Sequence, residues 1–192
     1  SLDTAEQKGT GKWTSQIALD MGVSAPTIAD AVFARTMSAM QAERVLASKL
    51  LKGPQPQAAQ NLAEVLPKIQ GALLAAKICA YAQGFALIKA GDQEHDWQLP
   101  MDKVASVWRA GCIIRAHLLE DIRRAFANQQ DLSNLLIDQH FARLMAECQQ
   151  DLREVVAMAA LNGVAVPAFM SALSYYDAYR TERLPVSYTH LT

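Results

Sequence analysis

The sequence predicts an all-α domain. Residues with high helix propensity dominate its 192 positions, apolar residues recur at helical spacing, and no convincing stretch of alternating β-branched residues indicates a strand. The 51% apolar content and formal charge of −1 are typical of one globular domain. We therefore expect helices joined by short links around a continuous core.

Prolines and glycines mark the expected helix ends. Four prolines open apolar periodic segments, as in a first helical turn, where the missing N–H is not needed. These are Pro26, Pro67, Pro100 and Pro167. Four glycines fall where such segments should stop, namely Gly22, Gly53, Gly91 and Gly163.

Together these signals predict seven helices. In the first half they cover about 12–21, 26–51 and 63–90, with a link at 52–57 and a polar loop at 91–99. In the second half they run from about 100 to 110, 114 to 128, 133 to 161 and 167 to 182.

Two segments of the sequence resemble each other. Residues 18–31 (ALDMGVSAPTIADA) align with 159–172 (AALNGVAVPAFMSA), and both read as a helix, a tight Gly turn and a helix opened by Pro. A match this short is compatible with a duplicated helical unit and with common hairpin sequences that coincide by chance.

The composition excludes several classes of function. The charge balance supplies no basic patch for a nucleic acid. The apolar stretch 71–88 carries Lys77 and Gln83 at its middle, which favours a core helix over a membrane span. Nothing at the amino end resembles a secretory signal.

Cys79, Cys112 and Cys148 lack the close spacing of zinc or redox motifs, so we expect buried, reduced thiols.

The most unusual local feature is the segment 8–14 (KGTGKWT), with two glycines between two lysines before a helix. Glycines let backbone N–H groups turn toward an anion, and a helix amino terminus adds partial positive charge. Lys8 and Thr10 are therefore candidate phosphate ligands. Trp13 stands where a Walker A loop needs Ser or Thr. The alternative is an ordinary loop capped by Thr10.

Arg35 is the second candidate, since it lies in an apolar helical segment. Lys8 precedes Gly22 by 14 residues and Arg35 follows it by 13. If these segments form a hairpin, both cations reach its open end. The alternative is that Arg35 pairs with Asp30 or another carboxylate.

Other candidates are weaker. His95, His117 and His140 have no second metal ligand three or four residues away, so no metal site is expected. No G-x-G-x-x-G dinucleotide fingerprint occurs.

Five segments, in the same order along the chain, resemble those of a known family. Residues 2–44, LKGPQ at 51–55, AYAQGF at 80–85, WRAGCIIR at 108–115 and SALSYYDAYRTERLP at 171–185 closely resemble the helical carboxy-terminal part of 6-phosphogluconate dehydrogenases. The resemblance covers residues 2–185. It assigns 1–185 to that helical domain and leaves 186–192 (VSYTHLT) as a tail that departs from the family, where His190 is no convincing match for the family histidine.

The resemblance implies a function. That family uses NADP, sometimes NAD, to oxidise and decarboxylate 6-phosphogluconate to ribulose 5-phosphate in the pentose phosphate pathway, as a cytoplasmic homodimer. Lys8, Thr10 and Arg35 match positions that hold or adjoin the substrate phosphate. The nucleotide-binding Rossmann domain and the catalytic lysine and glutamate precede residue 1 in the family, so no catalytic or cofactor-binding residue is expected here and the chain alone should be inactive. The alternative is a helical interaction or dimerisation module without a ligand.

Overall fold

The computed structural model describes residues 9–56, 61–111 and 117–184, and every regular element in them is helical. The all-α prediction is therefore confirmed. The elements are α1 (Thr10–Asp20), α2 (Pro26–Ala39), α3 (Gln41–Leu50), α4 (Leu62–His95), α5 (Met101–Gly111), α6 (His117–Asn128), a 3₁₀ turn η1 (Leu135–Ile137), α7 (Gln139–Leu161) and α8 (Pro167–Tyr179).

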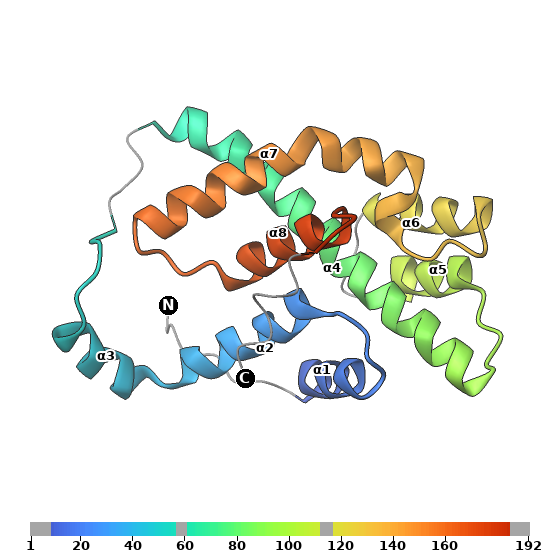
Figure 1. Cartoon of the computed structure of the whole chain (residues 1–192), viewed down its shortest axis with the longest axis horizontal. Helices are drawn as coiled ribbons and strands as arrows, with labels where there is room; N and C mark the ends of the chain where they lie inside the picture. The colour runs from blue at the N-terminus through green and yellow to red at the C-terminus, as the bar shows by residue number, and fades with distance from the viewer. Residues whose placement is uncertain (1–8, 57–60, 112–116, 185–192) are drawn as a thin grey trace.

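The long helix α4 crosses the whole molecule and organises the rest (Figure 1). Helices α7 and α8 pack against it, α5 and α6 pair with each other near its carboxy-terminal end, and α1 with α2 lies along another side. Helix α3 projects away from this body (Figure 1) and has no buried residue. The core is therefore built around α4, and α3 is an arm.

Helix α4 carries the core because small residues line its inner face. Ala72, Ala75, Ala82 and Cys79 are fully buried there, and their small side chains let neighbouring helices approach closely. By length and composition α4 could cross a membrane, but 44% of its most apolar window is buried inside the molecule. Its buried residues belong to the hydrophobic core, in agreement with the predicted core helix.

The similar segments 18–31 and 159–172 also form a structural repeat. At Gly22 and Gly163 the backbone has φ of 65° and 66°, a left-handed conformation that suits glycine. In both turns the N–H of the next valine donates to the carbonyl of an alanine five residues earlier at 2.8 Å. Each turn leads into a helix with Pro at its first position, and these helices, α2 and α8, pack against each other. Origin by duplication stays a prediction.

The single helix predicted over 26–51 is wrong, because the chain breaks at Met40, where ψ is 42°. Arg44 donates from Nη2 to the Ser38 carbonyl at 3.1 Å, an acceptor that a continuous helix would use internally. A side-chain contact therefore replaces a backbone bond, and the chain turns into α3.

Two predicted helix ends inside α4 are also wrong. Pro67 lies within the helix, not at its start. Gly91, taken as a stop, is a buried helical residue, and a Cβ there would lie 3.1 Å from the Trp97 ring. The helix continues to His95, so this glycine provides close packing and the expected loop is shorter.

The helix predicted to start near 133 begins later. Asn134 accepts a bond from Leu136 N at 2.9 Å and opens the 3₁₀ turn. Asp138 then caps α7 by accepting from the N–H groups of His140 at 2.9 Å and Phe141 at 3.1 Å. At the other end, α8 stops at Tyr179, short of the predicted 182.

Candidate anion-binding site

An open cleft of about 480 Å³ lies between the start of α1, the outer part of α2 and the middle of α4. Its floor is largely apolar and includes Ala31, Val32, Leu73 and Phe169. The polar groups at its walls are Thr10 on α1, Thr27 and Arg35 on α2, and Lys77 on α4. Two of the three residues predicted to hold an anion, Thr10 and Arg35, thus line one cleft. Lys8 lies outside the described residues.

The α1–α2 hairpin explains why these two residues meet. The turn at Gly22 reverses the chain, and the two helices pack together. Gly11 lies so close to Val32 that a Cβ on the glycine would be 2.8 Å from the valine Cγ2. The beginning of α1 therefore lies about one helical turn from Arg35 along α2. The predicted meeting of Lys8 with Arg35 stays a prediction.

Among the described residues, no side chain caps the start of α1. The N-cap residue is Gly9, with φ of 97°, and Thr10 is the first helical residue. The alternative in which Thr10 caps the helix is therefore wrong. Uncapped N–H groups at a helix amino terminus form a favourable environment for negative charge.

Only cations contribute formal charge to the described lining of this cleft. Arg35 and Lys77 are both exposed, and no carboxylate of the described residues lines the cleft with them. No ion pair between Arg35 and Asp30 is found in the described part of the chain. The formal charge of the described lining thus favours an anionic ligand.

A buried amide fixes the floor of the cleft. Gln83 of α4 is fully buried, accepts a bond from the Thr27 N–H at 2.9 Å and donates to the Thr27 Oγ1 at 2.9 Å. Thr27 is the second residue of α2, so Gln83 satisfies one of the donors that a helix start leaves unpaired. This pair holds α2, and with it Arg35, in a set position on α4. Sequence reasoning noticed Gln83 only as a polar residue in an apolar stretch.

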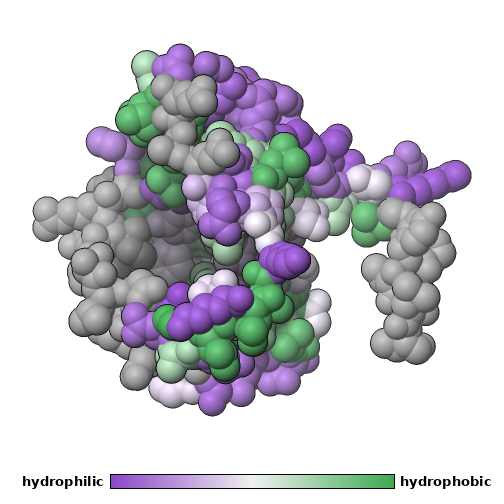
Figure 2. All heavy atoms as spheres, turned by 90° about the vertical axis from the view of Figure 1, so that its left-hand side faces the viewer, coloured by the Kyte–Doolittle hydropathy of each residue, from purple (hydrophilic) through white to green (hydrophobic). Residues whose placement is uncertain are grey.

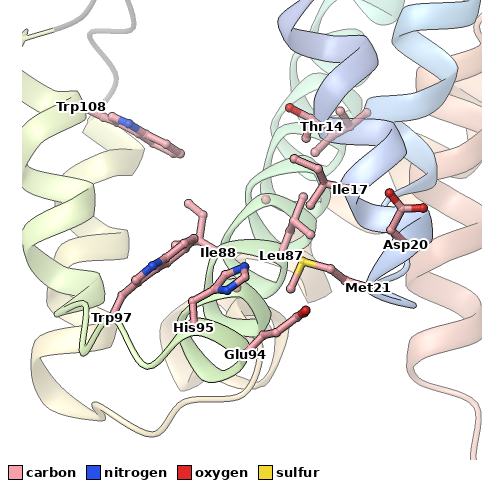
Figure 3. Close-up of a pocket in the computed structure, with 13 residues that line it drawn as sticks. Thr14, Ile17, Asp20, Met21, Leu87, Ile88, Glu94, His95, Trp97 and Trp108 are labelled. Atoms are coloured by element: carbon pink, nitrogen blue, oxygen red, sulfur yellow. The ribbon is translucent and has the colours of Figure 1, made fainter.

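A second, more apolar cleft of about 620 Å³ is lined by α1, by α4 with the loop that follows it, and by Trp108 near the end of α5 (Figure 3). Trp97 and Trp108 form one wall, and Ile17 of α1 and Met21, which follows α1, lie opposite (Figure 3). Its charged groups include Glu94 and none of the residues predicted to bind an anion.

The remaining predicted candidates lie elsewhere. His95 stacks on Trp97 with ring centroids 4.8 Å apart, and His140 Nε2 lies 3.6 Å from an Asp121 carboxylate oxygen. In the described residues no group of three or more His, Cys, Asp or Glu is placed to hold a metal ion. His95 thus packs on an aromatic ring, and His140 lies near a carboxylate.

The cysteines behave as predicted where the structure describes them. Cys79 and Cys148 are free and buried. Burial raises the pKa of the Cys79 thiol to about 12 and that of Cys148 to about 11, because a thiolate is poorly solvated in the core. Both thiols therefore stay protonated at neutral pH. Cys112 lies outside the described residues.

The architecture and the cleft define a class of protein, namely an all-helical domain with a candidate anion-binding site near its amino end. Comparison with known proteins identifies the family. The family description "6-phosphogluconate dehydrogenase, C-terminal domain" matches residues 1–191. The chain therefore belongs to the 6-phosphogluconate dehydrogenase family.

Individual relatives agree with this assignment. An NADP(+)-dependent, decarboxylating 6-phosphogluconate dehydrogenase of Bacillus subtilis is 49% identical over 187 residues, which are 97% of this chain and 40% of that protein. The decarboxylating enzyme of Salmonella typhimurium is 48% identical over 97% of this chain and 40% of its own length. The chain thus spans about two fifths of these curated bacterial relatives.

A solved structure is similar throughout. The Plasmodium falciparum 6-phosphogluconate dehydrogenase, determined in its apo form and in complexes with NADP+ and with its substrate 6-phosphogluconate, superposes with a TM-score of 0.90 at 33% identity. The match covers 98% of this chain and 41% of that one. The helical arrangement is therefore that of this family.

Proposed function

We propose that this chain is the helical, substrate-binding part of a cytoplasmic, NADP-dependent 6-phosphogluconate dehydrogenase that oxidatively decarboxylates 6-phosphogluconate. In this proposal Thr10 and Arg35, with Lys8, bind the phosphate of the substrate, and the helical body forms a homodimer. The observation that carries the site assignment is the cleft in which the start of α1 and Arg35 meet without a neighbouring carboxylate among the described residues. Family membership gives the chemistry of the expected ligand.

The binding logic follows from charge. A phosphate monoester carries close to two negative charges and accepts several hydrogen bonds. A guanidinium presents paired donors to such a group, and the N–H groups at the start of α1 add further donors. The phosphate is remote from the carbons that react, so these contacts hold the substrate in the ground and transition states alike.

NADP would be bound by other parts of the full-length protein. The sequence has no dinucleotide fingerprint, and the described residues include no strand on which a Rossmann-type site could be built. When bound, NADP supplies the hydride acceptor. The residues of this chain would position the substrate, so the chain alone should produce no NADPH from 6-phosphogluconate.

Thermal unfolding with 6-phosphogluconate and with gluconate tests the proposal. A ligand at one hundred times its Kd stabilises the native state by about 2.7 kcal/mol. For a chain of this size that corresponds to a rise in Tm of roughly 5–10 °C. Gluconate, which lacks the phosphate, should shift Tm much less. Two results would instead favour a helical interaction module without this ligand. One is an equal rise in Tm with both compounds, and the other is no rise in Tm with 6-phosphogluconate even at concentrations that would saturate a weak site.

A further inference from the structure

Lys77 is a second cation in the candidate anion cleft. It lies on α4 between the buried residues Ala76 and Ile78, but its own side chain is exposed and lines the cleft that Arg35 and Thr10 share. Its position in an apolar stretch indicated only that the stretch is no membrane span. The tertiary structure places it opposite α2.

The other described lysines of α4 have structural partners. Lys68 lies 2.8 Å from a Glu154 carboxylate oxygen. Lys89 donates to the backbone carbonyls of Asp131 at 2.8 Å and Leu132 at 3.0 Å, which ties α4 to the loop before η1. Lys77 forms no such contact with the described residues. A role in holding the helices together therefore does not explain it.

Two cations in one cleft repel each other unless an anion lies between them. The repulsion is stronger at a protein surface than in bulk water, because the effective dielectric constant there is lower. A purely structural arrangement would be expected to place a carboxylate nearby, and the described lining has none. A ligand with two negative charges relieves the repulsion and gains attraction from both side chains.

We propose that Lys77 is a further substrate-binding residue, which contributes a second positive charge to the phosphate and favours 6-phosphogluconate over unphosphorylated gluconate. The inference rests on the proposed function, because it assigns the same ligand to the same cleft. An ammonium on a flexible stem contacts a phosphate as a point charge with three donors, and Arg35 complements it with a planar, paired set. Lys77 thus contributes affinity and charge recognition.

The experiment measures binding of 6-phosphogluconate and of gluconate to the 192-residue chain by isothermal titration. The variants are Lys77→Ala, Lys77→Met, which keeps an apolar stem of similar length, and Lys77→Arg. Lys49→Ala is the matched control, because Lys49 is an exposed lysine on α3 and its loss changes the net charge equally. Circular dichroism melts report whether each variant is folded.

Loss of one charge-assisted contact predicts about tenfold weaker binding of 6-phosphogluconate in Lys77→Ala and Lys77→Met. Gluconate binding should not change in either variant. Lys77→Arg should keep most of the affinity, and Lys49→Ala should bind as the wild type does. The melting temperature of ligand-free Lys77→Met should be equal to or above that of the wild type, because a like-charge repulsion is removed.

A second readout distinguishes direct contact from a structural effect. A phosphate monoester has a second pKa near 6, and each adjacent cation lowers it. The ³¹P chemical shift of bound 6-phosphogluconate, followed against pH, should give a pKa about 0.5 to 1 unit higher in Lys77→Met than in the wild type.

The outcomes separate the two proposals. If the wild-type chain shows no preference for 6-phosphogluconate over gluconate, the proposed function fails and this inference fails with it. If the wild type shows the preference and both Lys77→Met and Lys77→Ala keep it, only the inference about Lys77 is overturned. An unchanged phosphate pKa in the folded Lys77→Met complex would also overturn it.

Discussion

Replacing Gln83 by Leu tests whether a single buried amide positions the candidate site. Leucine has a similar volume and is apolar, so the change removes two hydrogen bonds while leaving little cavity. The Thr27 N–H and hydroxyl, which now pair with Gln83 at 2.9 Å each, would remain buried without a partner. The variant therefore isolates the cost of unsatisfied polar groups.

The magnitude follows from those two groups. A buried donor left unpaired costs about 1–3 kcal/mol, and a hydroxyl that turns to another acceptor costs less. We expect a loss of about 2–4 kcal/mol in the free energy of unfolding, partly offset by the favourable burial of Leu. For a chain of 192 residues this lowers Tm by roughly 5–15 °C.

Urea unfolding followed by circular dichroism gives the free energy directly. The control is Gln70→Leu, since Gln70 lies on the same helix but is exposed, and such surface changes usually stay within about 0.5 kcal/mol. Because Gln83 holds the start of α2, binding of 6-phosphogluconate should weaken as well. A Gln83→Leu variant as stable as Gln70→Leu would refute the reasoning that this pair anchors α2 to α4.

Three further predictions follow. Arg35→Ala should weaken 6-phosphogluconate binding ten- to a hundredfold, measured by titration, because charge-assisted hydrogen bonds contribute about 1.5–3 kcal/mol. Arg35→Lys should recover only part of the lost affinity. An unchanged affinity together with lowered stability would make Arg35 a structural residue. Burial raises the pKa of the Cys79 thiol to about 12 and that of the Cys148 thiol to about 11 in the folded chain. The free energy of unfolding should therefore fall as pH rises above the unfolded thiol pKa of about 8.5, by up to about 2 kcal/mol per thiol at pH 10. Urea unfolding of the Cys79→Ala/Cys148→Ala variant should lack this extra loss. The chain should self-associate through exposed apolar residues of α2 and α3, such as Phe33 at 65% and Leu46 at 59% exposure. Figure 2 shows apolar patches on the side of the molecule toward which α3 projects. Sedimentation as a 21.0 kDa monomer at high concentration would contradict this expectation.

The sequence by itself determined the helical class, most of the helices and the hairpin turns. These features depend on neighbours within a few residues, such as the glycine at each turn and the proline that opens α2 and α8. The sequence also predicted that the start of α1 and Arg35 lie at the same end of the hairpin, because one tight turn at Gly22 and a constant rise per residue fix where the two helices end. Thr10 and Arg35 do line one cleft. The motifs that carry the family resemblance are likewise local in sequence.

Only the tertiary structure decided the rest, because those features depend on residues far apart in the chain. Thr27 and Gln83 are separated by 56 positions, and nothing in the local pattern of either one indicates the other. The sequence predicts that the helix stops at Gly91, because glycine often follows a helix end. The close approach of Gly91 to Trp97, which explains this glycine, depends on how the chain folds back after α4. Lys77 enters the cleft for the same reason, since helical periodicity gives the face on which a residue lies but not which helix will pack opposite it.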